Sequence, residues 1–519
     1  MTDPDMADKT YIEPLNAKRI EQIIEKENPD ALLPNLGGQS ALNLCAELEK
    51  SGVLKKHGIR VIGVRPDAIT RGENRIEFKN TVAELGIEMP QSAVAYSVEE
   101  AVKVAERLEY PVVLRPAYTM GGFGGGLVYN VEELREVALR GLSVSLVGQV
   151  LVEKALLGWN ELEIEVIRDS KNNMITACFI ENIDPLGIHT GDSVCTVPML
   201  TVSREAKEKM QEYAYKIVEK IGIVGGTNLQ FAYDRKNEKV LVIEINPRTS
   251  RSSALASKAT GCPIARISAK LAVGMNLDEI PCGKCGTLDK YTPSDDHVVV
   301  KFPNWEFDKF KDVRDSLNTQ MSSVGETMSM GKTFKEALQK AVRSLDDENQ
   351  GLGMRENLKN KTREELVSAA SEPTSTRLFV IYEALRKGAS VDEIAEMTNI
   401  SKFFIEQIKE LADEETKLLK YSGRIPSDAV IRRAKKDGFS DKYIGMLIKL
   451  PEDEVREARI EMEITESWEK VHVTGTEKSA YYYSTYNSDA PAEISDKKKV
   501  IIIGGGPNRI GQGIEFDYC

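Results

Sequence analysis

The chain has 519 residues, a net charge of −12 at neutral pH, and 41% hydrophobic and 29% charged residues. This globular composition excludes a wholly disordered chain, and the length predicts roughly three or four domains. The sequence has no continuous apolar run of the kind that spans a membrane, and its negative charge argues against nucleic-acid binding. The start, MTDPDMADKT, lacks the basic and apolar segments of a signal peptide. Seven cysteines, with Cys282 and Cys285 as the one close pair, are typical of a reducing compartment, so we expect a cytoplasmic protein.

Short helix and strand signals alternate in residues 1–65. Apolar residues at helical spacing predict a helix over 17–27, and a second helix is expected at about 40–51. Strands are predicted at 31–34 and 60–64. Repeating αβ units imply a parallel sheet, and the missing strand before the first helix suggests a domain that is incomplete at its start.

Residues 66–345 carry longer, mixed patterns that we interpret as one α/β domain. A Ser97-x-x-Glu100 pair is a capping signature, and it predicts the start of a helix. The elements expected in this region are helices over 97–108, 203–221, 252–260 and 264–273, strands over 111–115, 150–156, 161–168 and 174–180, and a hairpin that joins 228–233 to 240–246.

Residues 346–497 are charged and helical in pattern, so we expect an all-α domain. The spacing around Ser390 recurs around Ser440, and each copy predicts a short helix, a turn and a second helix. Such a unit could be a DNA-binding motif. Residues 390–410 contain five acids and two lysines, however, and this charge favours packing or subunit association. After a polar linker at 484–499, an apolar strand at 499–503 and the run GGGPNRIGQG predict that a new αβ domain begins at about residue 498.

A glycine-rich loop is the strongest single signal of an anion site. Arg115 ends a predicted strand and is followed by the loop MGGFGGG, which includes Gly121 and Gly122. Glycines let backbone N–H groups approach phosphate oxygens closely, and the fork of an arginine side chain suits the same oxygens. A flexible surface loop is the alternative, and the flanking arginine favours the phosphate interpretation.

Two polar pairs interrupt the apolar hairpin. Glu244 and Asn246 are two residues apart, so their side chains project from one face of the strand, and Asn228 and Gln230 form a similar pair on the partner strand. Carboxylate and amide oxygens suit a hard cation such as Mg²⁺. Because Arg248 and Arg251 follow, these residues together predict a metal–phosphate site of the kind that phosphoryl transfer requires.

Three weaker signals favour ordinary roles. His189 stands alone beside a glycine, which favours a hydrogen-bonding residue over a general base. Cys282 and Cys285 resemble half of a zinc site, but no second pair follows, so we expect a loop with two free thiols. The segment 501–513 lacks the full dinucleotide-binding fingerprint, and this argues against an NAD site.

Four long motifs carry a resemblance to a known family. They are RPAYTMGGFGGGL, ENIDPLGIHTGDSV, EINPRTSRSSALASKATG and the terminal GGGPNRIGQGIEFDYC. Together they resemble the large subunit of carbamoyl-phosphate synthase, a member of the ATP-grasp ligases, over essentially the whole chain. The resemblance implies a partial Rossmann-like pre-ATP-grasp domain (1–65), an ATP-grasp domain (66–345), a helical oligomerisation domain (346–497) and the start of a second pre-ATP-grasp domain (498–519).

The resemblance also implies a role for each site residue. Arg75, Arg115, Gly121 and Gly122 would bind ATP phosphates, and Lys154 and Leu156 would lie in the hinge whose main chain contacts adenine. Glu161 would contact the ribose, and Gly187, Ile188 and His189 would complete the nucleotide pocket. Gln230, Glu244 and Asn246 would hold two Mg²⁺ or Mn²⁺ ions, with K⁺ as a further candidate ion, and Asn228, Arg248 and Arg251 would face bicarbonate. The sequence departs from the family at Lys154, where we expect an acid, but a main-chain contact tolerates that change.

The activity implied is phosphorylation of bicarbonate to carboxyphosphate, followed by attack of ammonia to give carbamate, in arginine and pyrimidine biosynthesis. The implied partners are a glutaminase small subunit, a second synthetase half and further copies joined through the helical domain, with neither nucleic acid nor membrane. The alternatives are another ATP-grasp ligase, such as a biotin-carboxylase-like enzyme, and an inactive fragment that acts as an association module.

Overall fold

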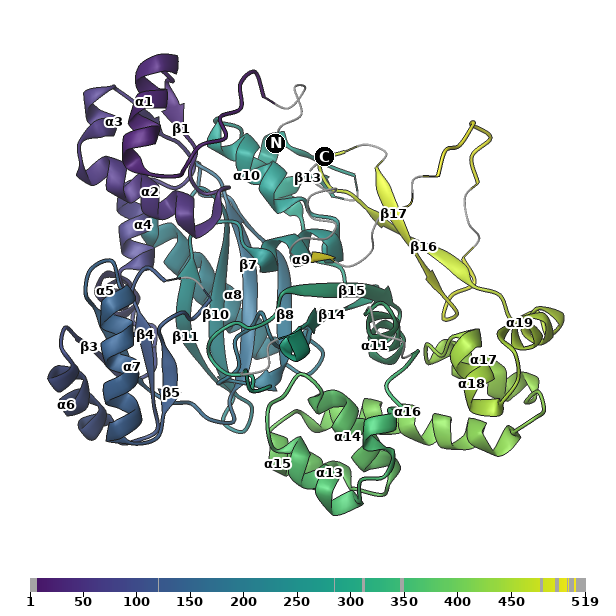
Figure 1. Ribbon diagram of the computed structural model, residues 1–519. Helices are drawn as coiled ribbons and strands as arrows, with labels where there is room; N and C mark the ends of the chain where they lie inside the picture. Colours follow the sequence, from purple (N-terminus) through teal and green to yellow (C-terminus); the bar gives the residue numbers. More distant parts are fainter. Residues whose placement is uncertain are drawn as a thin grey trace.

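The computed structural model describes residues 7–119, 121–283, 285–309, 313–345, 350–476, 479–490, 494–501, 503 and 508–509. Within these residues, an eight-stranded and a four-stranded β-sheet with helices packed on them lie beside a cluster of helices (Figure 1). This arrangement confirms the α/β class with a helical region behind it.

The first αβ unit matches its prediction in order and strand direction. It consists of α1 (Ala17–Glu27), β1 (Ala31–Leu32), α2 (Gly38–Lys50), α3 (Val53–Lys56) and β2 (Arg60–Val61). The two strands pair in parallel, as expected, although both are shorter than predicted.

A small sheet forms the next layer, in the order β3-β6-β4-β5. Helix α6 begins where the sequence predicts it, because the Ser97 side chain accepts a hydrogen bond from the Glu100 N–H at 3.2 Å. Apolar side chains of α6 and α7 form one core with the strands of this sheet. The elements of this part are α4 (Pro66–Glu73), α5 (Arg75–Glu84), β3 (Ser92–Ala95), α6 (Val98–Leu108), β4 (Val112–Pro116), β5 (Gly126–Val128), α7 (Val131–Val144) and β6 (Val150–Lys154).

A large antiparallel sheet forms the centre of the molecule, in the order β11-β10-β7-β8-β9-β14-β15-β18 (Figure 1). Helix α8 shares a core with one face, through Leu162, Ile164 and Val166 of β7. Helices α9 and α10 share a second core with Ile167 and Ile175, which belong to the opposite face. The elements are β7 (Asn160–Arg168), β8 (Met174–Pro185), β9 (Cys195–Val197), α8 (Arg204–Ile221), β10 (Gly225–Asp234), β11 (Lys239–Asn246), α9 (Arg251–Thr260), α10 (Ile264–Ala272), β12 (Pro281–Cys282), β13 (Gly286–Thr287), β14 (Val298–Asn304) and β15 (Gly325–Gly331).

The helical region confirms the predicted repeat. In the first copy, α15 ends at Asn399 in a left-handed conformation before α16 begins, and in the second copy Lys449 does the same between α18 and α19. Val300 and Phe302 of β14 belong to the same core as these helices, so the region packs directly on the large sheet. The helices are α11 (Phe334–Arg343), α12 (Glu356–Lys359), α13 (Arg363–Ala370), α14 (Arg377–Arg386), α15 (Val391–Thr398), α16 (Lys402–Leu418), α17 (Asp428–Lys436), α18 (Asp441–Ile448) and α19 (Glu452–Glu461).

The chain after α19 differs from the prediction. A hairpin of β16 (Ser467–His472) and β17 (Ala480–Thr485) follows where only helices were expected, and Val471 and Tyr483 pack into the core beside α9. The described residues between 499 and 503 are not a strand. Strand β18 (Asn508–Arg509) instead pairs with β15 at the edge of the large sheet. The rest of the predicted new domain lies outside the described residues.

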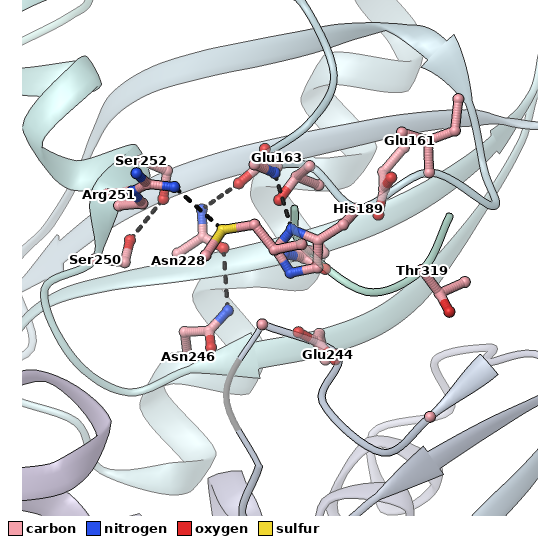
Figure 2. Close-up of a pocket in the computed structure, with 18 of the residues that line it drawn as sticks. Glu161, Glu163, His189, Asn228, Glu244, Asn246, Ser250, Arg251, Ser252 and Thr319 are labelled. Atoms are coloured by element: carbon pink, nitrogen blue, oxygen red, sulfur yellow. Dashed lines mark hydrogen bonds between the residues drawn. The ribbon is translucent and has the colours of Figure 1, made fainter. Parts of the chain in front are cut away.

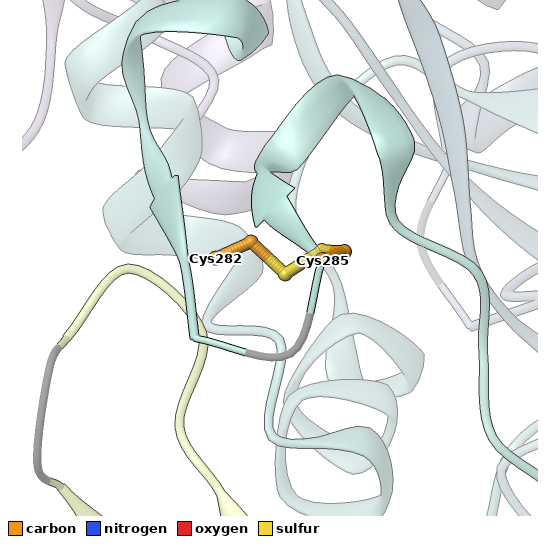
Figure 3. Close-up of a disulfide and its surroundings, with 2 residues drawn as sticks. All are labelled: Cys282 and Cys285. Carbon is orange, nitrogen blue, oxygen red and sulfur yellow. A yellow bond between two sulfur atoms is a disulfide. The ribbon is translucent and has the colours of Figure 1, made fainter.

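The cysteine pair also corrects its prediction. Cys282 and Cys285 are joined by a disulfide, with their Cα atoms 5.3 Å apart, where two free thiols were expected (Figure 3). The hairpin of β12 and β13 brings the two residues together, because Cys282 pairs with Gly286 across the turn. Spacing alone could not show this turn.

None of the helices in the described part of the chain has the length and apolar character needed to cross a membrane.

Candidate functional site

A cavity of about 250 Å³ lies where the small sheet faces the large one. Strand β4 of the small sheet contributes Arg115, and strands β7, β10 and β11 of the large sheet contribute carboxylate and amide side chains (Figure 2). The cavity brings together most of the residues singled out in the sequence. They are Arg75, Arg115, Gly121, Gly122, Glu161, Gly187, Ile188, His189, Asn228, Gln230, Glu244, Asn246, Arg248 and Arg251.

Glu244 is the centre of the charge network. Its Oε2 lies 3.3 Å from Nη1 of Arg75, which opens helix α5, and 3.4 Å from Nη1 of Arg115. Arg115 also contacts the buried Glu153 on the neighbouring strand, with Nε 3.3 Å from Oε1. Burial raises the pKa of Glu244, but the two guanidinium groups outweigh it and hold that pKa below its usual value. Glu244 is therefore ionised at neutral pH and joins the two sheets.

The two polar pairs of the hairpin face one another, as the spacing predicted. Asn228 is opposite Asn246 in the antiparallel register, and Gln230 is opposite Glu244. Nδ2 of Asn246 donates to Oδ1 of Asn228 at 3.4 Å. Side chains of directly paired residues project from the same face, so these oxygens form one patch on the cavity wall.

Strand β7 extends this patch with acids that the sequence analysis missed. Nδ2 of Asn228 donates to Glu163 at 3.1 Å and to Glu165 at 3.0 Å. The alternation of acids in 161–165 was visible in the sequence, but the register with β10 is what places them beside Asn228. A further missed residue is the buried Lys301 of β14, which donates to the carbonyl of Thr190 at 2.8 Å.

Burial changes the charge of these acids. It raises the pKa of Glu161 to about 8, with the neighbouring Glu163 adding to the shift. It also raises the pKa of Glu165 to about 7, although hydrogen bonds from Ser252 and Ser253 oppose the rise. At neutral pH the cavity-lining Glu161 is therefore mostly protonated and stands beside the ionised Glu244.

The glycine loop has a backbone conformation and surroundings that favour glycine. Gly121 and Gly122 have φ values of 62° and 72°, in the left-handed region that favours glycine. A Cβ atom on Gly122 would lie 2.0 Å from the carbonyl oxygen of Thr319. Both glycines line the cavity together with Arg115.

The two residues that were predicted to lie in the hinge line a smaller adjoining cavity. Lys154 and Leu156 line a space of about 30 Å³ that shares Arg115 and Gly187 with the main cavity. The Lys154 side chain donates to the carbonyl of Leu108 at 2.8 Å, at the end of α6. The Lys154 side chain thus has a hydrogen-bond partner at the end of α6.

His189 has a hydrogen-bonding role in the structure. It follows Gly187, whose φ is 118°, and the buried Ile188. Its Nδ1 accepts a hydrogen bond from the Gly191 N–H at 3.0 Å. Burial lowers the pKa of His189, so the ring is neutral at physiological pH.

The two arginines after the hairpin point toward different neighbours. Arg248 donates from Nε to Gln39 at 2.9 Å and from Nη2 to Oδ1 of Asn246 at 3.2 Å. Arg251, the first residue of α9, is exposed, and its Nη1 lies 3.1 Å from the sulfur of Met321 (Figure 2). Arg248 is therefore fixed beside the patch, while Arg251 lines the cavity with an exposed side chain.

Sequence comparisons match the same regions. The carbamoyl-phosphate synthase L chain ATP-binding domain matches residues 74–280, and the carbamoyl-phosphate synthetase large chain oligomerisation domain matches residues 326–463. The carbamoyl phosphate synthase preATP-grasp domain matches residues 1–71 and 496–519. The chain belongs to the carbamoyl phosphate synthase large-chain family. It corresponds to the N-terminal half of such a large chain.

Curated relatives align over the whole chain. The carbamoyl phosphate synthase large chain of Archaeoglobus fulgidus is 48% identical over 100% of this chain and 49% of its own length. The arginine-specific, chloroplastic large chain of Arabidopsis thaliana is 45% identical over 100% of this chain and 44% of its own length. The chain thus spans about half the length of the curated relatives that it matches.

Solved structures share the fold. The biotin carboxylase of Campylobacter jejuni, in complex with β-γ-ATP, has a TM-score of 0.50 at 17% identity and covers 74% of this chain and 85% of its own. The biotin carboxylase domain of the Hydrogenobacter thermophilus 2-oxoglutarate carboxylase, in complex with MgADP, ADP and bicarbonate, has a TM-score of 0.53 at 17% identity. It covers 78% of this chain and 90% of its own. At this identity the likeness shows a common fold.

Proposed function

We propose that this chain is an ATP-dependent ligase that phosphorylates bicarbonate to carboxyphosphate and lets ammonia convert that product to carbamate. The observation that carries the proposal is one cavity that combines a glycine loop, the Arg75–Glu244–Arg115 network and the patch of amide and carboxylate oxygens. Membership of the large-chain family supports the same reaction.

Each group has a proposed role that the family resemblance implies and that its place in or beside the cavity supports. Arg75 and Arg115, with Gly121 and Gly122, bind the ATP phosphates at the boundary between the sheets. The main chain at Lys154 and Leu156 contacts the adenine, and Glu161 contacts the ribose. Gly187, Ile188 and His189 form the remaining wall of the nucleotide pocket, and Asn228, Arg248 and Arg251 face the bicarbonate.

The oxygen patch fits divalent cations. Gln230, Glu244 and Asn246 present hard oxygen donors on one face, and Glu244 is ionised. We propose that the patch holds two Mg²⁺ or Mn²⁺ ions, with K⁺ as a further candidate. When bound, such ions neutralise phosphate charge.

The proposed chemistry proceeds in two steps. An oxygen of bicarbonate attacks the γ-phosphorus of ATP, the bond to the β-phosphate oxygen breaks, and ADP leaves. Arg248 and Arg251 then hold the carboxyphosphate while the nitrogen of ammonia attacks its carbon and phosphate leaves, giving carbamate. Guanidinium groups already in place stabilise the charge that develops on the oxygens without reorganisation.

The proposed context extends beyond the chain. A glutaminase small subunit would supply ammonia, and a second synthetase half would phosphorylate the carbamate to carbamoyl phosphate for arginine and pyrimidine synthesis in the cytoplasm. We propose that the chain divides into regions 1–65, 66–345 and 346–497. Copies would associate through the helical region, 346–497. Residues from 498 onward would begin the second half.

Release of ADP tests the proposal. Folded chain is incubated with MgATP, with and without bicarbonate, beside the Arg115→Ala variant. We expect bicarbonate to stimulate ADP release in the parent and not in the variant. ATP binding without stimulation would favour another ATP-grasp ligase, and the absence of ATP binding would favour an association module.

A further inference from the structure

Residues 315–323 form an irregular segment, here called the strap, that contributes to the wall of the cavity. Thr319 and Met321 of the strap line the cavity, and Figure 2 shows Thr319 at its side. Leu317 is buried, at 5% exposure, whereas its neighbour Asn318 is exposed. The strap has no regular secondary structure, so its position depends on the contacts at its two ends and in its middle.

The middle of the strap is bonded to both loops that form the nucleotide pocket. The N–H of Met321 donates to the carbonyl of Gly121 at 2.9 Å, and the N–H of His189 donates to the carbonyl of Asn318 at 2.7 Å. The carbonyl of Thr319 lies against Gly122 so closely that any Cβ there would clash. The strap therefore sets where the glycine loop and the 187–189 loop lie relative to each other.

The end of the strap is fixed by a buried carboxylate. Asp192, at 1% exposure, accepts hydrogen bonds from the N–H groups of Ser322 and Ser323, each at 2.7 Å. Two charge-assisted bonds from adjacent amides hold the backbone firmly in one orientation. The strap thus enters strand β15 from a fixed point beside the cavity.

The start of the strap is fixed to the helical region instead. Asp315 accepts from the N–H of Ser375 at 2.9 Å and from its hydroxyl at 2.7 Å, in the turn between α13 and α14. The N–H of Leu317 donates to the carbonyl of Pro373 in the same turn at 2.8 Å. One continuous backbone therefore joins the helical region to the glycine loop within a few residues.

We propose that the strap makes the ATP affinity of the cavity depend on the position of the helical region, with Asp315 as a positioning residue. A shift of the α13–α14 turn moves the start of the strap, and the bonds at Gly121 and Asn318 pass that shift to the two nucleotide loops. This inference rests on the proposed function, because it assumes that the cavity binds ATP. It adds a route by which association of the helical regions regulates the same site.

Weakening of the attachment at Asp315 tests the proposal in the full chain. In Asp315→Asn, we expect ATP, titrated with Mg²⁺ by calorimetry, to bind roughly fivefold or more weakly, which is the low end of typical coupling between sites. We also expect faster amide hydrogen exchange in peptides that cover Gly121 and Gly122. Ser375→Ala removes only the hydroxyl contact and should give a smaller change in the same direction, and the double variant should be no worse than Asp315→Asn.

Arg314→Ala is the matched control. Arg314 precedes Asp315 and pairs with Glu372 at 3.0 Å, but both side chains are exposed, at 78% and 62%. It should leave ATP affinity and glycine-loop exchange unchanged. The proposal is overturned if exchange rises only around Asp315 while the glycine loop and the ATP affinity stay as in the parent. If Asp315→Asn does not fold, Ser375→Ala decides by the same criteria.

The outcomes separate the two proposals. A parent chain that binds no ATP contradicts the proposed function, and the exchange of the glycine loop in the variants still decides whether the strap transmits the change. A parent that binds ATP but releases no ADP with bicarbonate contradicts the reaction and leaves both strap measurements valid.

Discussion

Replacing Glu244 by glutamine tests the charge network at the centre of the cavity. The carboxylate contacts Arg75 and Arg115 at 3.3 and 3.4 Å, and the three side chains are only 17–24% exposed. At an effective dielectric constant of about 20, each contact is worth roughly 5 kcal/mol before desolvation is subtracted. Removing one partner of a buried ion pair costs about 3–5 kcal/mol, and the residual exposure favours the lower end. We expect Glu244→Gln to lower the free energy of unfolding by about 3 kcal/mol.

Urea denaturation without nucleotide, followed by circular dichroism, measures this loss, and bicarbonate-stimulated ADP release measures the loss of activity. The control is Glu84→Gln on α5, which breaks an exposed pair with Lys220 at 2.9 Å. Such a pair contributes about 1 kcal/mol at most. Equal stability of the two variants would refute the central role of Glu244 in joining the sheets. Retained ADP release in Glu244→Gln would refute its role in binding the cation.

Three further predictions concern other parts of the structure. Gly122→Ala should weaken ATP binding, measured by calorimetry, by at least roughly tenfold, because the backbone is left-handed and a Cβ would clash with the Thr319 carbonyl. Unchanged affinity would show that the loop adopts another position. Without ligands, unfolding free energy should fall as pH rises from about 5 to 8, because Glu161, with a pKa of about 8, keeps a proton that the unfolded chain has lost. Glu161→Gln should flatten that pH profile, and an equally steep profile would contradict the assignment. Cys285→Ser should lower the free energy of unfolding by about 2 kcal/mol or less, because the disulfide closes a very short loop. ATP affinity should be unchanged, and weaker ATP binding would show that the disulfide hairpin affects the cavity.

Much of the secondary structure could be predicted from local patterns in the sequence. The helix that begins after Ser97 was predictable because its N-cap hydrogen bond involves residues three apart. The repeat around Ser390 and Ser440 was predictable for a similar reason, because the N-cap and the left-handed residue that ends each short helix are set by residues close in sequence. The polar pairs of the hairpin were found because side chains alternate along a strand and one turn sets the register.

Contacts between distant segments were decided only by the tertiary structure. The pairing of β16 with β17 was missed because their position depends on a core shared with α9, about 200 residues earlier in the chain. The role of Glu163 was missed because it depends on the pairing of β7 with β10. The strap was missed because an irregular segment has no periodicity, and its position depends on contacts with Asp192 and Ser375.

The sequence by itself therefore determined which residue types were available for the cavity and on which strands and loops they stand. Its motifs also carried the family resemblance, because long runs such as the glycine loop must keep both their spacing and their backbone conformation. The tertiary structure decided which of these residues meet. Glu244 contacts Arg115 across 129 positions of sequence, and a contact of that kind follows from the packing of two sheets, which no local pattern encodes.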